Sequence, residues 1–160
     1  MVKNNKNLLI KFIFLVSIIA LTSALFIEYI LGHQPCNLCV LERIPYLLAI
    51  IIVLFNYKFT QFKKFFVLLL AIIFLAGTIL SLYHLGIEQG FIEESLVCDL
   101  KSGSNLLSKE EILKQFQEKS VSCKDVTFKI FGLSLTTFNI LISFLLTVFL
   151  TKIYFDYGKN

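Results

Sequence analysis

Two cysteines and an arginine, Cys36, Cys39 and Arg43, have a spacing that suits redox chemistry. A Cys-x-x-Cys pair can form a strained disulfide, and a helix start together with a nearby cation lowers the pKa of a thiol toward reactivity. On a helix these positions are i, i+3 and i+7, so they share one face. That face could present a thiolate and a guanidinium to one planar electron acceptor, whose carbonyl oxygen the arginine would polarise.

Two other interpretations of these residues are structural. Arg43 could extend to the lipid headgroups and pair with Glu42 or Glu28. The cysteines could hold zinc, because Cys98 and Cys123 would complete a four-cysteine site. However, 24 residues separate this second pair instead of two, so the second half of a zinc ribbon is missing. We therefore expect a redox pair and no metal, since a structural disulfide has little use for an adjacent arginine.

The composition is typical of a membrane protein. Hydrophobic residues make up 57% of the 160 residues and the mean hydropathy is +0.80, whereas soluble domains average about 45–50% apolar residues. The net charge of +4 does not indicate nucleic-acid binding, because the lysines are scattered among apolar runs and leave no soluble basic face. All four cysteines lie between the apolar runs, which indicates redox chemistry or disulfides facing an oxidising compartment.

The apolar runs predict four membrane-spanning helices, since a bilayer core about 30 Å thick needs about 20 helical residues. The predicted spans are residues 8–31, 38–57, 65–85 and 133–153. The first run is longer than the apolar region of a signal peptide and has no clear cleavage site, so we expect a retained anchor. The second run is long enough only if its helix begins near Leu38, and Pro45 then predicts a bend in that helix.

These spans predict an all-α membrane fold: one integral-membrane domain over residues 1–160, formed by a four-transmembrane-helix antiparallel bundle. Two loops, at about 32–37 and 86–129, connect spans on the cysteine side. In the second, Ser108-Lys109-Glu110-Glu111 resembles a capping box that opens a short amphipathic helix to about Lys119. That helix would pack on its own loop or rest on the membrane surface.

The distribution of lysines predicts the topology, because Lys and Arg are enriched in short cytoplasmic flanks. Lysines flank the ends of the spans opposite the cysteines, while the short cysteine loop holds only Arg43. The long loop has six lysines and eight acidic residues, a net charge of −2. Both termini are therefore expected in the cytoplasm, with the cysteine loops outside.

Residues 35–43, Pro35-Cys36-Asn37-Leu38-Cys39-Val40-Leu41-Glu42-Arg43, resemble the PCxLCxxER signature of the DsbB family. Members are bacterial inner-membrane disulfide:quinone oxidoreductases that reoxidise the periplasmic protein DsbA. The resemblance covers nearly the whole chain and includes residues 83–88 at the third span exit and residues 131–134 before the fourth span. The chain departs from the family at Leu135-Thr136-Thr137-Phe138, where Met-Pro-x-Trp is usual, and lacks a Gly-Pro before the first loop cysteine.

This resemblance implies electron transfer from a periplasmic DsbA-like thioredoxin-fold oxidase to ubiquinone or menaquinone in the lipid. It implies that Cys39 faces the quinone beside Arg43, while Cys36 exchanges with the loop pair. Cys98 would accept the mixed disulfide from the partner, and Cys123, once released, would attack Cys36. It also implies a multi-pass protein of the bacterial inner membrane.

Three polar residues near the cysteines remain. His84 and Glu88 are i and i+4 at the outer end of the third span, where they could border the quinone or assist protonation. Alternatively, they only mark where that helix leaves the lipid, and His33 is expected to be an ordinary loop residue.

Two functional alternatives also stay open. A protein like vitamin K epoxide reductase is disfavoured, because that family places its membrane Cys-x-x-Cys late, after its loop pair. A non-enzymatic membrane scaffold would carry Cys36–Cys39 and Cys98–Cys123 as permanent disulfides.

Overall fold

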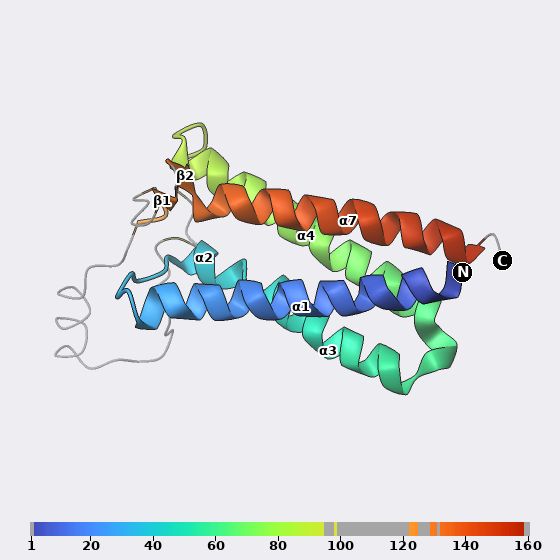
Figure 1. Ribbon diagram of the computed structural model, residues 1–160. Helices are drawn as coiled ribbons and strands as arrows, with labels where there is room; N and C mark the ends of the chain where they lie inside the picture. The colour runs from blue at the N-terminus through green and yellow to red at the C-terminus, as the bar shows by residue number, and fades with distance from the viewer. Residues whose placement is uncertain (1, 95–97, 99–121, 125–128, 131, 159–160) are drawn as a thin grey trace, which may run out of the picture.

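The computed structural model describes residues 2–94, 98, 122–124, 129–130 and 132–158. The elements in chain order are α1 (Val2–Tyr29), α2 (Asn37–Leu41), α3 (Ile44–Lys58), the 3-10 helix η1 (Thr60–Phe62), α4 (Lys63–Glu88), β1 (Lys129–Ile130), β2 (Leu133–Ser134) and α7 (Leu135–Gly158). Four long helices run side by side, with both chain ends at one end of the bundle and α2 at the other (Figure 1).

Four segments of helix are long and apolar enough to cross a membrane, as the sequence predicts. They are Leu8–Tyr29, Asn37–Lys58, Lys63–Glu88 and Leu135–Asp156. Large apolar side chains stay exposed along all four, such as Phe26, Phe65 and Phe155. In water such a surface would drive aggregation, whereas in lipid it is the expected exterior of a bundle whose backbone groups are satisfied within helices. The predicted all-α membrane bundle is confirmed.

The second span differs in detail from the single bent helix that the sequence predicts. α2 ends at Leu41, and α3 begins at Ile44 after a turn through Glu42 and Arg43. Pro45 therefore lies in the first turn of α3, where a missing N–H costs little, instead of in a helix interior. The break before the proline allows the cysteine segment to take its own direction.

Helix packing is most extensive between α4 and α7, followed by α1 with α3 and α3 with α4. Small residues permit these approaches, since helices in lipid associate through close contact and not through the hydrophobic effect. A Cβ on Gly77 would lie 3.1 Å from Pro45 Cγ, so the glycine allows α4 to approach α3. A larger apolar cluster centred on Phe74, Ile13 and Leu150 fills the bundle toward the end that carries the termini.

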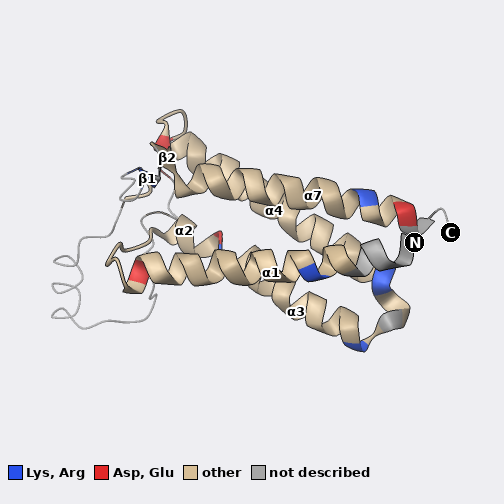
Figure 2. Ribbon diagram, in the orientation of Figure 1, with Lys and Arg blue, Asp and Glu red and all other residues tan. Residues whose placement is uncertain are grey.

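Figure 2 shows that lysine and arginine lie mainly toward the end of the bundle with the two termini. Lys58 ends α3, and Lys63 and Lys64 begin α4. The two-residue strands β1 and β2 form an antiparallel hairpin just before α7, which the sequence did not predict. The predicted amphipathic helix at 108–119 lies outside the described residues.

Candidate active site at the cysteine end

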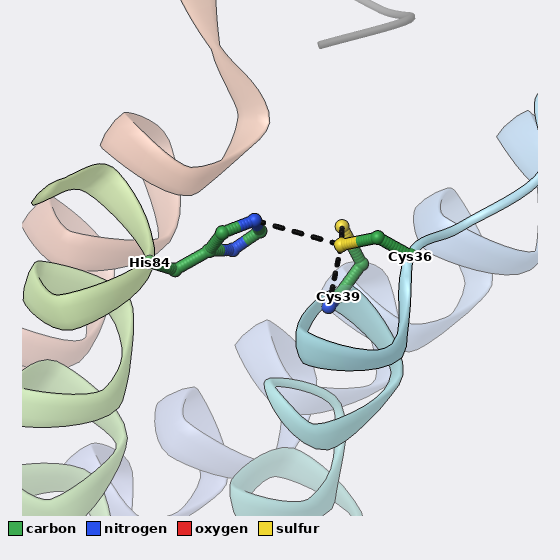
Figure 3. A group of neighbouring side chains, drawn as sticks. All are labelled: Cys36, Cys39 and His84. Carbon is green, nitrogen blue, oxygen red and sulfur yellow. Dashed lines mark hydrogen bonds between the residues drawn. The ribbon is translucent and has the colours of Figure 1, made fainter. Parts of the chain in front are cut away.

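Cys36 and Cys39 lie together at the start of α2. Cys36 is the N-cap of this helix, and its sulfur accepts a hydrogen bond of 3.2 Å from the backbone N–H of Cys39. The two Sγ atoms are 2.7 Å apart and are not bonded (Figure 3). Cys36 is buried and Cys39 is partly exposed. A small movement of one side chain would bring the two sulfurs to bonding distance, so the pair can form a disulfide when an electron acceptor is present.

His84, near the end of α4, faces this pair (Figure 3). Its Nε2 lies 3.5 Å from Cys36 Sγ, and its Nδ1 lies 2.7 Å from Glu42 Oε1. The imidazole is 1% exposed, so it is enclosed between a thiol and a carboxylate. A nucleophile, a base and a group that orients the base are the parts of an activated thiol. His84 therefore lies at the end of its span and also contacts the cysteine pair.

Glu42 lies in the stretch that resembles the PCxLCxxER signature, but the only role expected for it from the sequence was pairing with Arg43. It is 8% exposed, and its Oε2 accepts a 2.8 Å hydrogen bond from Asn139 Nδ2 on α7. The same amide group donates to Ser81 Oγ at 2.8 Å, while its Oδ1 accepts from the Tyr46 hydroxyl. The carboxylate therefore contacts side chains of α4 and α7, and Asn139 is itself held by Ser81 of α4 and Tyr46 of α3. The sequence signal for Glu42 was its place in the PCxLCxxER-like stretch, three residues after Cys39.

Arg43 points to α1 and pairs with Glu28, with 2.5 Å between its NH1 and Glu28 Oε2. Of the two partners considered from the sequence, the structure selects Glu28. This ion pair ties the α2–α3 turn to the end of α1.

Glu88 and Thr136 complete the polar contacts around His84. Thr136 Oγ1 donates to Glu88 Oε1 at 2.6 Å and lies 3.2 Å from His84 Nδ1. Glu88 Oε1 is 3.8 Å from His84 Nε2. Thr136 belongs to the four residues at which the chain departs from the family pattern, so that departure supplies a hydroxyl to the site.

A cavity of about 360 Å³ opens beside the cysteines. Its walls are mostly apolar and come largely from α1 and α7, and Cys39, Arg43 and Glu88 are among its polar lining residues. His33, predicted to be an ordinary loop residue, also lines it. An apolar pocket with a few convergent polar groups is the usual form of a small-molecule site.

Cys98 and Cys123 form a disulfide with a Cα–Cα distance of 5.8 Å. Both are buried, and they pack in one cluster with Cys36 and with Leu38 of α2. The Asn37 side-chain amide donates to the Cys98 carbonyl at 3.4 Å, which joins Cys98 to the start of α2. The structure thus places the two cysteine pairs side by side.

Cys36 precedes the second span and has an acidic thiol. Hydrogen bonding from the Cys39 side chain, together with the hydrogen bond and charge of His84, lowers the pKa of Cys36 to about 5 against the opposing effect of burial. In the reduced pair Cys36 is therefore the thiolate at neutral pH, and the thiolate is the form that exchanges with disulfides.

Comparison with known proteins identifies the family of this chain. The family model described as "Disulfide bond formation protein DsbB" matches residues 6–153. A curated relative, "Uncharacterized protein RP370" of Rickettsia prowazekii (strain Madrid E), is 38% identical over 150 residues, which cover 91% of this chain and 85% of that protein. No solved structure matches the chain. The chain is a multi-pass membrane protein that belongs to the DsbB family of disulfide bond formation proteins.

Proposed function

We propose that this protein is a disulfide:quinone oxidoreductase of the bacterial inner membrane. It oxidises the dithiol of a periplasmic DsbA-like thioredoxin-fold protein and passes the two electrons to ubiquinone or menaquinone. One observation carries this proposal: two cysteine pairs lie in one cluster, and the pair at the helix start borders an apolar cavity between membrane-spanning helices. Such a cavity suits an acceptor that is dissolved in lipid.

The loop pair receives the electrons first. A thiolate of the partner attacks Cys98, forms a mixed disulfide and releases Cys123 as a thiolate. The second thiol of the partner resolves the mixed disulfide, and the partner leaves oxidised. Cys123 then attacks Cys36 of the oxidised Cys36–Cys39 pair, which releases Cys39, and Cys98 closes the loop disulfide again by displacing Cys36. Two electrons have then moved from the partner to Cys36 and Cys39.

Cys39 and Arg43 are the residues that would hold the quinone, which accepts two electrons and two protons when bound. Both line the cavity, as does Glu88. Arg43 is fixed by its ion pair with Glu28, so its charge is placed in advance of binding.

His84 stabilises the Cys36 thiolate in this scheme. Its Nε2 faces the sulfur, while Glu42 holds Nδ1 and so fixes the orientation of the ring. When the pair is reoxidised, Cys36 is already the thiolate, so the sulfur–sulfur bond forms without removing a proton from this sulfur. An imidazole at this distance stabilises that thiolate through its hydrogen bond and its charge.

The lysines support an orientation with both termini in the cytoplasm and the cysteine end in the periplasm. They lie mainly at the bundle end that carries the termini (Figure 2), and positively charged flanks favour the cytoplasmic side.

The direct test uses purified protein in detergent with a soluble quinone and a reduced DsbA-like protein, followed by the loss of quinone absorbance. Cys39→Ala should abolish the reaction, whereas Thr151→Ala, an exposed change near the C-terminal end of α7, should leave it unchanged. Quinone reduction that persists in Cys39→Ala would refute the proposal.

A trapping experiment separates this enzyme from a disulfide-stapled scaffold. In Cys123→Ser, Cys98 is a free thiol, and its thiolate can attack the disulfide of the oxidised partner, whose second cysteine leaves as a thiolate. No Cys123 is present to displace the partner from Cys98, so this mixed disulfide should accumulate. Non-reducing gel electrophoresis detects this complex. A scaffold would never form it, because its disulfides do not exchange.

A further inference from the structure

Three potential metal-binding atoms converge at the cysteine end: Cys36 Sγ, Cys39 Sγ and His84 Nε2. All three lie within 4.8 Å of one another. Two come from the start of α2 and the third from α4, so they are joined only by the fold (Figure 3). The four-cysteine zinc site considered from the sequence is a different set, because its loop cysteines are bonded to each other.

The chemistry of this set matches a soft divalent metal. Two thiolates and one imidazole are ligands that Zn²⁺ binds in tetrahedral sites, and a fourth position then stays open to water. Thiolates select zinc over magnesium or calcium, which prefer oxygen. The disulfide form of the pair offers no thiolate, so only the reduced pair provides this donor set.

The distances require one local adjustment. With zinc–sulfur bonds of about 2.3 Å and a zinc–nitrogen bond of about 2.0–2.1 Å, tetrahedral ligand atoms lie roughly 3.5–3.8 Å apart. The 3.5 Å between Cys36 Sγ and His84 Nε2 already fits. The sulfurs, now 2.7 Å apart, must separate by roughly 1 Å. Cys39 is only partly buried, and a rotation of its side chain can provide this separation.

The surroundings of His84 also suit a metal ligand. Metal-binding histidines almost always donate their second N–H to a carboxylate or another acceptor, which fixes the tautomer and the ring orientation. Here Nδ1 lies 2.7 Å from Glu42 Oε1, and Asn139 holds the other oxygen of that carboxylate. This arrangement presents the lone pair of Nε2 to the two sulfurs.

We propose that the reduced Cys36–Cys39 pair and His84 form a Zn²⁺ site, and that bound metal stops electron transfer from the pair. Binding releases the protons that the two thiols and His84 Nε2 still carry and changes no oxidation state. A sulfur that is bound to zinc is a poorer nucleophile and electron donor. The Cys36–Cys39 pair therefore stays reduced until the metal dissociates. The inhibitory part rests on the proposed function, whereas metal binding does not.

Binding is measured on the full chain in detergent, without quinone or partner protein. Co²⁺ serves as the probe, because thiolate coordination produces sulfur-to-cobalt charge-transfer absorption, and Zn²⁺ should displace it. The reduced protein should bind one Co²⁺ per chain, and the oxidised protein none. A chain with Cys98→Ser and Cys123→Ser should behave identically, which assigns the sulfur ligands to the remaining pair.

Substitutions test whether His84 is the nitrogen ligand and whether Glu42 strengthens metal binding through it. His84→Gln should remove the imidazole ligand and abolish tight binding, while His33→Gln replaces the other histidine of the chain and should leave the affinity unchanged. Glu42→Gln should weaken Zn²⁺ binding about 10- to 100-fold, the usual effect of losing a partner of a metal-bound histidine.

Equal cobalt binding by the reduced and oxidised chains would overturn the metal site, as would spectra without sulfur charge transfer. The comparison of redox states needs no variant and therefore does not depend on whether a substitution folds. Turnover with added Zn²⁺ tests the inhibition separately. Cobalt binding without quinone reduction would refute the proposed function alone, and quinone reduction without cobalt binding would refute only the metal site.

Discussion

Asn139 is the residue whose replacement tests the polar contacts of the site most sharply. Its amide nitrogen donates to Glu42 Oε2 and to Ser81 Oγ, both at 2.8 Å, and its oxygen accepts from the Tyr46 hydroxyl. Asn139→Leu removes all three while keeping a similar volume. The change leaves one oxygen of a buried carboxylate without its donor.

The size of the effect follows from the charge on Glu42. Neutral hydrogen bonds between membrane helices average about 0.6 kcal/mol, whereas hydrogen bonds to charged groups contribute about 1.5–3 kcal/mol. We expect Asn139→Leu to lower the free energy of unfolding by about 1.5–3 kcal/mol, because the carboxylate stays buried. The rate of quinone reduction should fall with it, since Glu42 orients His84 toward Cys36.

A second buried asparagine provides the matched control. Asn56 on α3 is 3% exposed, and its Oδ1 has no hydrogen-bond partner among the described residues. Asn56→Leu should therefore cost less than about 0.6 kcal/mol and leave turnover unchanged. Reversible unfolding in mixed detergent and SDS, followed by circular dichroism, gives the change in the free energy of unfolding for Asn139→Leu and for Asn56→Leu.

A double-mutant cycle with Glu42→Gln decides whether the amide acts through the carboxylate. The two substitutions should be non-additive by more than about 0.5 kcal/mol, the limit for independent sites. Additive effects, or an Asn139→Leu penalty no larger than that of Asn56→Leu, would refute this account of the site.

Three further outcomes are expected. Gly77→Leu should lower the free energy of unfolding by about 1–3 kcal/mol, because its Cβ would already lie 3.1 Å from the proline of α3, whereas the neighbouring lipid-facing Ala76→Leu should be neutral by the same SDS titration. Arg43→Ala should raise KM for quinone in steady-state assays. Disulfide exchange between the partner and the loop pair, measured by gel shift, should keep its rate. A slower exchange would contradict the role of Arg43 in holding the quinone. Thr136→Val removes the hydroxyl that contacts Glu88 and His84 and should slow turnover. Thr137→Val should leave turnover unchanged, because the Thr137 hydroxyl contacts Ser134 instead.

The fold could be predicted from the sequence because length and hydropathy alone determine whether a run can cross lipid. Each of the four predicted spans overlaps a helix of the bundle. The exact course of the second span could not be predicted, since a proline is compatible either with a bend inside a helix or with the first turn of a new one. The choice depends on how closely α4 approaches, which Gly77 and Pro45 decide together.

The cysteines were predictable as a site because their chemistry shows in local spacing. The contacts of Glu42, His84 and Asn139 were not, since these residues are distant in sequence and meet only when α2, α4 and α7 pack. A glutamate beside an arginine suggests a local ion pair, and the actual partner of Arg43 is on α1. The catalytic roles assigned to the four cysteines stay predictions.

The cavity beside the cysteines has a kinetic consequence for any acceptor that dissolves in the bilayer. Its walls come largely from the membrane-spanning helices α1 and α7. Occupancy is then governed by the mole fraction of acceptor in the lipid and not by its concentration in the surrounding water. In reconstituted vesicles, diluting the suspension with buffer should leave the turnover per protein unchanged, while diluting the acceptor with additional lipid should reduce it.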